Sequence, residues 1–177
     1  MNGVVLVTGV MAAGKSTVAQ ALAERLPRAA HVRGDVFRRM IVSGREEYVP
    51  GSSGEAEAQL RLRYRLSAAT ADAYAEAGFT AVVQDVVLGE NLTAYVGLVR
   101  TRPLYVVVLA PDAETVAARE AGRAKTGYDD TVWTVPALDE ALRESTPRIG
   151  LWLDTSGLTP ARTVEAILAG RERARVL

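Results

Sequence analysis

Nine residues near the start of the chain have the types and spacing needed to hold a chain of phosphates. The first eight match the pattern G-x-x-x-x-G-K-[ST], and the nine are Gly9, Val10, Met11, Ala12, Ala13, Gly14, Lys15, Ser16 and Thr17. Glycines in this pattern let the backbone turn its N–H groups toward phosphate oxygens, and the helix that follows adds partial positive charge. We expect Lys15 to reach the β- and γ-phosphates and the Ser16 hydroxyl to bind Mg²⁺. The pattern therefore predicts a nucleoside triphosphate site.

Asp35 stands where a second predicted strand ends and a second predicted helix begins. Its structural interpretation is a helix N-cap, a position that Asp fills well. Its chemical interpretation is a carboxylate that faces the γ-phosphate, where it takes a proton from a substrate hydroxyl or holds Mg²⁺. The two interpretations are compatible, and we predict that Asp35 is a catalytic, a substrate-binding and a metal-binding residue.

A second carboxylate, Asp85, follows a predicted apolar strand at 80–87. Hydrophobic residues surround it in the sequence, and burying it without a partner would be costly. It is either a residue on the metal side of the phosphates, a hydrogen-bond partner of the acceptor substrate, or a structural partner of a neighbouring helix. The sequence leaves these alternatives open.

The segment 119–128 combines cations with glycines and carries Arg119, Arg123 and Lys125. Phosphoryl transfer requires positive charge over the oxygens of the transferred group, supplied when the substrates are closed off from water. We therefore expect a lid over approximately 119–134, in which Arg119 and Arg123 neutralise charge in the transition state.

Strand and helix patterns alternate along the chain that must position these side chains. We expect strands at 4–8, 30–33, 80–87, 104–109 and 149–153, and helices at 15–26, 35–43, 55–77, 90–100, 112–121, 136–144 and 160–172. The strands are rich in Val and apolar without alternation, as parallel strands covered on both faces should be. The pattern predicts a three-layer α/β fold with a five-stranded parallel sheet. Ligands bind beyond the carboxyl ends of such strands, where the motifs fall.

Composition narrows the class of protein further. The chain has 177 residues, 49% of them hydrophobic, and a formal net charge of zero with no Cys. We expect one domain spanning 1–177, with neither nucleic acid nor membrane as a partner. No secretory signal or membrane-length apolar run is visible, so a cytoplasmic monomer or homodimer is expected.

The chain resembles small phosphate-loop kinases over nearly its whole length, a group that includes shikimate kinase, gluconate kinase, adenylylsulfate kinase and chloramphenicol phosphotransferase. The likeness depends on 9–17, on Asp35, on the strand 105–109 that leads to Arg119 and Arg123, and on 152–160. It implies a P-loop NTPase fold with ATP as the phosphate donor. It also implies that backbone near Thr155 and Gly157 holds the adenine, with Arg119 packing on the base. Asp35 is similar in place to the proposed base of chloramphenicol phosphotransferase, which favours antibiotic-type hydroxyl acceptors.

The acceptor is expected to contact approximately 35–78, the main insertion between the nucleotide-binding elements. Arg38 and Tyr48 are the preferred candidates in this region, together with Asp35 and Asp85. Tyr64 is expected in the core, because it belongs to an apolar helical stripe. Arg61, Arg63 and Arg65 lie on the same predicted helix and cannot all point one way. The Gly-rich acceptor loop of shikimate kinases is missing after Asp85, which argues against that acceptor.

The motifs together predict an ATP- and Mg²⁺-dependent kinase that phosphorylates a hydroxyl of a small molecule, such as an antibiotic or a sugar-like metabolite. One alternative is a nucleoside or nucleotide kinase, which would share the fold and the lid. Another is a regulatory module that binds a nucleotide without phosphorylating a metabolite. No N-K-x-D guanine-reading motif is present, which argues against a GTP switch.

Overall fold

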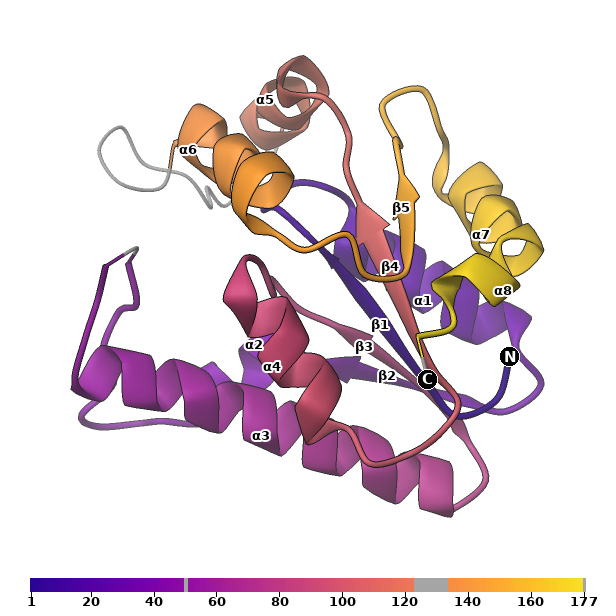
Figure 1. Ribbon diagram of the computed structural model, residues 1–177, viewed down its shortest axis with the longest axis horizontal. Helices are drawn as coiled ribbons and strands as arrows, with labels where there is room; N and C mark the ends of the chain where they lie inside the picture. Colours follow the sequence, from indigo (N-terminus) through magenta and orange to yellow (C-terminus); the bar gives the residue numbers. More distant parts are fainter. Residues whose placement is uncertain (50, 123–133, 177) are drawn as a thin grey trace.

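Five parallel strands form one sheet in the order β2-β3-β1-β4-β5. The computed structural model describes residues 1–49, 51–122 and 134–176. The strands are β1 (Val4–Gly9), β2 (Ala29–Arg33), β3 (Thr80–Gln84), β4 (Leu104–Leu109) and β5 (Leu151–Leu153). Figure 1 shows β1 at the centre of the sheet, between β3 and β4. The predicted α/β class with a five-stranded parallel sheet is confirmed.

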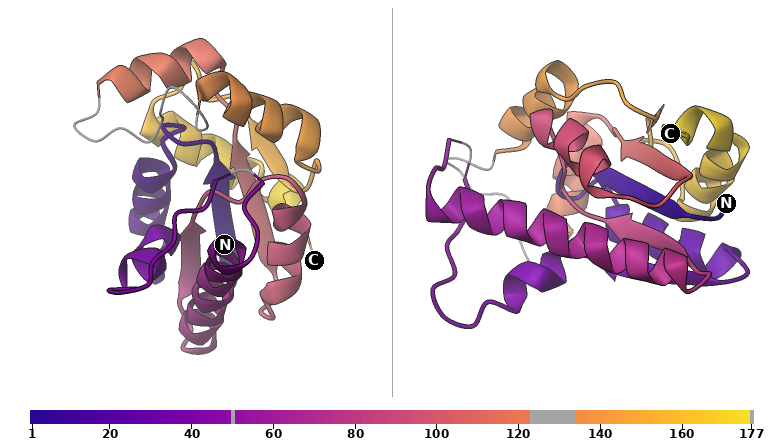
Figure 2. Two further views of the ribbon diagram at one scale, coloured as in Figure 1. Left: turned by 90° about the vertical axis from the view of Figure 1, so that its left-hand side faces the viewer. Right: turned by 60° about the horizontal axis from the view of Figure 1, so that its bottom comes forward.

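Helices cover both faces of this sheet and complete three layers (Figures 1 and 2). One layer contains α1 (Lys15–Arg25) and α7 (Pro160–Ala169), which pack against each other, and the opposite layer contains α3 (Glu55–Glu76) and α4 (Glu90–Leu98). The remaining elements are α2 (Gly34–Arg39), α5 (Ala113–Ala121), α6 (Val135–Glu140), the π-helical turn η1 (Ala141–Ser145) and α8 (Arg171–Ala174). None of the helices in the described part of the chain is long and apolar enough to cross a membrane.

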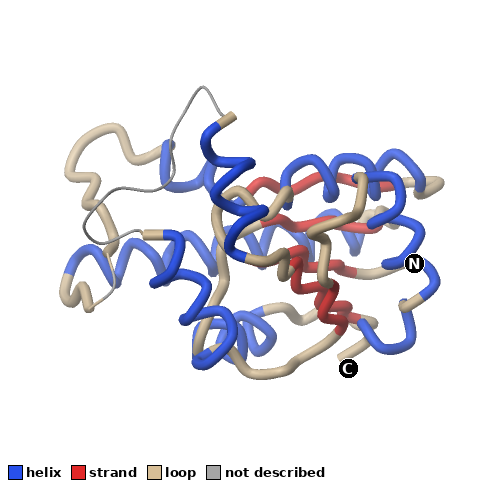
Figure 3. The backbone as a smooth tube through the Cα atoms, turned by 90° about the horizontal axis from the view of Figure 1, so that it is seen from above, coloured by secondary structure: helices blue, strands red, loops and turns tan. Residues whose placement is uncertain are grey.

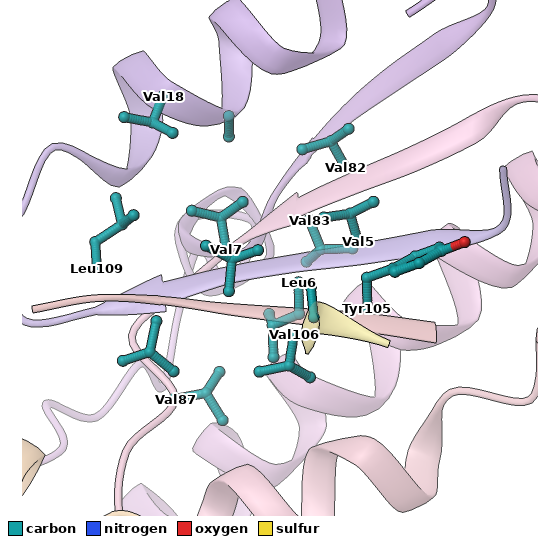
Figure 4. Close-up of a cluster of buried hydrophobic side chains, with 14 of the residues drawn as sticks. Val5, Leu6, Val7, Val18, Val82, Val83, Val87, Tyr105, Val106 and Leu109 are labelled. Carbon is teal, nitrogen blue, oxygen red and sulfur yellow. The ribbon is translucent and has the colours of Figure 1, made fainter. Parts of the chain in front are cut away.

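The core lies around β1 and β4, whose residues are buried along their full length. Branched side chains such as Val5, Val7 and Val106 fill the space between the sheet and both helical layers (Figure 4). Burying each such side chain contributes roughly 1.5–3 kcal/mol, which explains why strands without polar alternation are stable here. The rigid centre of the sheet therefore supports the loop that follows β1.

Several elements end earlier than the sequence predicts. The helix predicted at 35–43 ends at Arg39, and β3 ends at Gln84 rather than at 87. After Gln84 the chain leaves the sheet, because Asp85 turns toward a partner on α3 and the backbone N–H of Val87 donates to Thr8 Oγ1 at 2.9 Å. The helix predicted at 160–172 is divided at Gly170 into α7 and α8. These endings decide which side chains reach the edge of the sheet.

The carboxyl ends of all five strands lie at one edge of the sheet, because the strands are parallel. Figure 3 shows the strands side by side from above, with the helices on either side. The segments that leave this edge are the loop 10–14 after β1, Asp35 after β2, Asp85 after β3 and Thr155 after β5. The fold therefore brings the motif-bearing segments 9–17 and 152–160, near opposite ends of the sequence, to one edge of the sheet.

Candidate active site

The loop 10–14 forms an open cradle between β1 and α1. Gly14 caps α1 in the left-handed conformation with φ of 91°, which glycine adopts at little cost, and a Cβ there would meet open space. No side chain caps α1, so the first N–H groups of this helix point to an opening that an anion can fill. Lys15 is 8% exposed, and its Nζ donates to the carbonyl of Val10 at 2.6 Å. The lysine is thus folded over the cradle.

Ser16 lies at the start of α1 and faces the end of β3. Its Oγ donates to Gln84 Oε1 at 3.1 Å. Gln84 is buried in β3 beside β1, with Cα pairing to Val7, so the register of the sheet fixes this contact. The hydroxyl predicted to bind Mg²⁺ is therefore held at the floor of the cradle by a neutral amide.

Asp35 lies in the first turn of α2, one residue inside the helix, because α2 begins at Gly34 and Arg33 is its cap. It does not cap the helix, although an acidic residue in a first turn is stabilised by the helix dipole. Its Oδ2 accepts from Arg39 Nη2 at 2.9 Å, an i,i+4 ion pair. Its Oδ1 is buried and has no hydrogen-bond partner among the described residues. Such an orphaned carboxylate oxygen indicates a site for a proton donor or a cation.

Asp85 is fully buried and is held by Arg63 of α3. Arg63 Nε donates to Asp85 Oδ2 at 2.9 Å, Arg63 Nη2 donates to Asp85 Oδ1, and the N–H of Val86 donates to Oδ1 at 2.7 Å. Burial raises the pKa of Asp85, while the Arg63 guanidinium and the Val86 N–H oppose that rise. Of the alternatives open for Asp85, the structural partner of a neighbouring helix is the one these contacts support.

Arg119 lies in the last turn of α5 and connects the cradle with the loop after β5. Its Nη2 donates to the carbonyl of Thr155 at 2.8 Å, and its Nη1 donates to the carbonyl of Ala13 at 3.4 Å. The guanidinium therefore lies between the two segments that were predicted to hold the phosphates and the adenine. Arg123, Lys125 and most of the predicted lid 119–134 lie outside the described residues.

The loop after β5 contains the two residues assigned to adenine binding, Thr155 and Gly157. Thr155 is 2% exposed, and its Oγ1 is a second buried polar atom without a partner in the described part of the chain. Gly157 has open space where a Cβ would be. The loop is anchored at Ser156, whose Oγ accepts from the N–H of Asp112 at 2.8 Å.

A pocket of about 440 Å³ joins the cradle with Asp35, Asp85 and Arg119, whereas the predicted adenine-binding residues Thr155 and Gly157 do not line it. It is lined by Met11, Ala12, Gly14, Lys15, Ser16, Thr17, Asp35, Arg63, Gln84, Asp85, Val86 and Arg119. Of the two acceptor candidates on the described chain outside this set, Arg38 pairs with Glu47 and Tyr48 lies in the loop before α3, and neither lines the pocket.

Three residues of this pocket, Arg63, Gln84 and Val86, are absent from the predicted site. The sequence held a signal for Arg63, because a carboxylate at Asp85 after an apolar strand needs a cation to be buried. Tyr64 is core as predicted, at 4% exposure, and donates to the carbonyl of Val86 at 2.8 Å. Arg61 pairs with Glu57, so neighbouring arginines on α3 do point in different directions.

The pocket fits a nucleotide with a hard cation. Lys15, Arg63 and Arg119 bring positive charge to it, and the start of α1 offers uncapped N–H groups. Ser16 and Asp35 offer oxygen atoms, the ligands that Mg²⁺ prefers. No cluster of three or more His, Cys, Asp or Glu side chains that could hold a metal occurs in the described residues. Mg²⁺ would therefore take most of its ligands from phosphate and water.

Comparison with known proteins agrees with this geometry. A family model described as an AAA domain matches residues 4–147. No curated protein sequence matches the chain.

Solved structures with this fold include several kinases. A sugar kinase from Janibacter sp. HTCC2649 superposes with a TM-score of 0.71 at 20% identity, covering 98% of this chain and 96% of that one. The APS kinase CysC of Mycobacterium tuberculosis, in complex with AMPPNP and APS, gives 0.67 at 16% identity, covering 97% and 98%. The tunicamycin resistance protein of Deinococcus radiodurans gives 0.66 at 16% identity, covering 100% and 99%. The chain therefore has a P-loop kinase-like fold, and the resemblance to small phosphate-loop kinases is confirmed.

Proposed function

The chain belongs to the AAA domain family that matches it, and we propose that it is an ATP- and Mg²⁺-dependent phosphotransferase acting on a hydroxyl of a small molecule. One observation carries this proposal. The buried, unpartnered Oδ1 of Asp35 lies in the same pocket as Lys15 and the uncapped start of α1. A general base beside a phosphate cradle is the arrangement that phosphoryl transfer to an alcohol requires.

Each side chain of the pocket has a role in this reaction. Lys15 leaves the carbonyl of Val10 and binds the β- and γ-phosphates, together with the N–H groups at the start of α1. Ser16 and Asp35 would hold Mg²⁺, which would neutralise phosphate charge. Asp35 Oδ1 takes the proton of the acceptor hydroxyl while the hydroxyl oxygen forms the new bond to phosphorus. Arg119, and Arg123 of the predicted lid, stabilise the charge on the transferred group until ADP leaves.

The acceptor is proposed to be sugar-like or an antibiotic, in line with the names of structures that share this fold, a sugar kinase and a tunicamycin resistance protein. It would bind against 35–78, with Asp85 fixing the wall of the site through Arg63. Thr155 and Gly157 would contact the adenine. We also propose a cytoplasmic monomer or homodimer. Its net charge of zero gives no electrostatic reason to require nucleic acid or an anionic membrane as a partner.

The proposal is tested by measuring ADP release from ATP and Mg²⁺ across a panel of sugars, aminoglycosides, phenicols, nucleoside antibiotics and nucleotides. We expect at least one compound to stimulate release and to gain the mass of a phosphate. Lys15→Ala should abolish transfer and weaken ATP binding at least tenfold, because the lysine contacts the phosphates directly.

Asp35→Asn keeps the size of the side chain and removes the base. We expect it to lower kcat by about 10²–10⁴ while ATP affinity stays within about threefold of wild type. Arg39→Gln is the matched control, because it removes the partner of Asp35 Oδ2 and leaves the carboxylate in place. Full activity of Asp35→Asn would refute Asp35 as the base. Stimulation by nucleotides alone would favour a nucleotide kinase, and ATP binding without any stimulated turnover would favour a regulatory module.

A further inference from the structure

Gln84 ends β3 at the floor of the pocket, between the phosphate cradle and Asp35. β3 lies between β1, which leads into the cradle, and β2, which leads to Asp35 (Figure 1). The register of the sheet pairs the Cα of Gln84 with Val7 of β1 and with Arg33 of β2. The side chain is only 5% exposed and lines the pocket. An amide that is buried so deeply needs partners for both of its ends.

One end of this amide is used and the other is open. Gln84 Oε1 accepts from Ser16 Oγ at 3.1 Å, whereas Nε2 makes no hydrogen bond to any described residue. Nε2 is also not one of the buried polar atoms that lack a partner in that part of the chain, so it is accessible from the pocket that Gln84 lines. It therefore offers an N–H donor to a ligand in the pocket.

Mg²⁺ bound to Ser16 would fix which end of the amide faces the pocket. Without a metal, a serine hydroxyl can either donate to Oε1 or accept from Nε2. A hydroxyl oxygen that binds a metal uses a lone pair for that bond, so its proton must go to an acceptor on another side. Oε1 is the acceptor that Gln84 provides, and Nε2 consequently stays directed to the pocket.

The open donor of Gln84 and the open acceptor of Asp35 complement each other. Asp35 Oδ1 is buried without a partner among the described residues and lines the same pocket, yet Gln84 Nε2 does not bond to it. In the proposed reaction, Asp35 takes the proton of the incoming hydroxyl and the cradle with Lys15 holds the donor phosphates. The transferred phosphoryl group lies between them, and its oxygens require donors.

We propose that Gln84 Nε2 donates a hydrogen bond to an oxygen of the γ-phosphoryl group of ATP, while Gln84 Oε1 holds the Ser16 hydroxyl. Gln84 is then a catalytic residue. A neutral amide suits this position, because its N–H stabilises the charge on the transferred group, whereas a carboxylate would repel it. This inference rests on the proposed function, but the contact with the γ-phosphate is measurable without transfer.

The decisive experiment compares two nucleotides that differ in the γ-phosphate. The affinities of ADP and of the non-hydrolysable analogue AMPPNP are measured by calorimetry at saturating Mg²⁺, and their ratio isolates the contribution of the γ-phosphate. Gln84→Met has an uncharged side chain of similar length without the donor. We expect it to lower the preference for AMPPNP over ADP about tenfold or more, because a hydrogen bond to a charged oxygen is lost. An unchanged preference overturns the proposal.

Gln84→Glu distinguishes a contact with phosphate from a contact with the metal. The carboxylate keeps an acceptor for the Ser16 hydroxyl but replaces Nε2 with an oxygen. Beside the γ-phosphate the added negative charge is repelled, so the preference for AMPPNP should fall at least as far as in Gln84→Met. Beside Mg²⁺ the same charge would be attracted. A preference equal to or greater than that of wild type would therefore place Gln84 on the metal and overturn the proposal.

Gln20→Met is the matched control for the loss of an amide. Gln20 lies on α1, one turn after Ser16, but its amide bonds Glu24 and His31 and does not line the pocket. Both affinities should stay at their wild-type values in this variant. An equal loss of ADP and AMPPNP binding in Gln84→Met would leave the preference unchanged and would count against the proposal, as general damage to the site.

Turnover separates this inference from the proposed function. With an acceptor from the panel, Gln84→Met should lower kcat about 10²–10³-fold and leave the KM of that acceptor within about threefold of wild type, because the lost donor acts on the transferred group. A wild-type kcat would overturn the role of Gln84. A preference for AMPPNP that depends on Gln84, in a protein that phosphorylates no compound, would instead contradict the proposed function alone.

Discussion

At the scale of single residues, Gly34 and Asp85 share one small space. A Cβ on Gly34 would overlap the carboxyl group of Asp85, although the backbone of Gly34 is helical and suits any residue. The absence of a side chain at Gly34 is therefore what allows Asp85 to lie flat against α2 and to meet Arg63. The ion pair between Asp85 and Arg63 therefore depends on Gly34, a residue without a side chain.

Replacing Gly34 tests this dependence. Gly34→Ala should lower the free energy of unfolding by about 1–3 kcal/mol, because the added methyl group pushes Asp85 out of its pair with Arg63. Unfolding in urea measures the change. Gly97→Ala is the control, because Gly97 lies exposed in α4 with open space around it and should gain up to about 1 kcal/mol of helix stability. Equal stability of Gly34→Ala and wild type would contradict the packing described for this space.

The residues of the pocket also show which parts of the site could be predicted from the sequence. The loop 9–17 and Asp35 were predicted from local patterns, and the structure brings both to one pocket. Arg63 was not predicted, because its partner Asp85 is 22 positions away and the pairing exists only once α3 packs on β3. Gln84 was missed for the same reason, since its contact with Ser16 depends on the register of β1 and β3. Contacts between residues that are far apart in the sequence leave no pattern in the sequence around either residue.

At the scale of elements, the alternation of strands and helices was predicted well, and most ends lie within two residues of the prediction, but α2 and β3 end three or four residues early. The long runs of buried Val identify β1 and β4 without ambiguity. The end of β3 at Gln84 depends on where Asp85 and Val87 find their partners, and the valines on both sides, 82–83 and 86–87, hide that change of direction. Termini of elements follow tertiary contacts more than propensity.

Asp72 connects α3 to the segment before β4, at the edge of the sheet opposite the pocket. It is 1% exposed and accepts from the N–H of Thr101 at 2.9 Å and from the N–H of Arg100 at 3.2 Å. Asp72→Ala should lower the free energy of unfolding by about 2–3 kcal/mol, because two backbone donors lose their acceptor. AMPPNP affinity, measured by calorimetry, should stay at the wild-type value.

Glu76 provides the comparison for Asp72. It pairs with the same Arg100 at 3.4 Å, but its side chain is 68% exposed, so Glu76→Ala should change stability by less than about 0.5 kcal/mol. A similar loss from both variants would show that the charge of Arg100, and not the buried backbone donors, determines the role of Asp72.

At the scale of the whole molecule, the pocket is made from segments that follow four of the strands, so a bound nucleotide should stabilise the entire sheet. AMPPNP with Mg²⁺ at about 100 times its Kd should add about 2.7 kcal/mol to the free energy of unfolding. For a chain of this size that corresponds to a rise in Tm of roughly 5–10 °C. A thermal scan measures the shift, which should fall to about half or less in Lys15→Ala at the same ligand concentration, because binding at least tenfold weaker leaves at most about 1.4 kcal/mol. A shift of the full wild-type size in Lys15→Ala would place the nucleotide elsewhere.

The central position of β1 in the sheet has a consequence for the synthesis of the chain on the ribosome. β1 ends at Gly9, yet the strands that flank it begin at Thr80 and Leu104. A ribosome that adds about 5–20 residues per second must work for several seconds before β1 can pair with anything. During that interval its hydrophobic run Val4–Val7 is exposed along with both of its edges, a state prone to aggregation. The strand that supports the loop 10–14 in the folded protein is thus the strand that waits longest for a partner during synthesis.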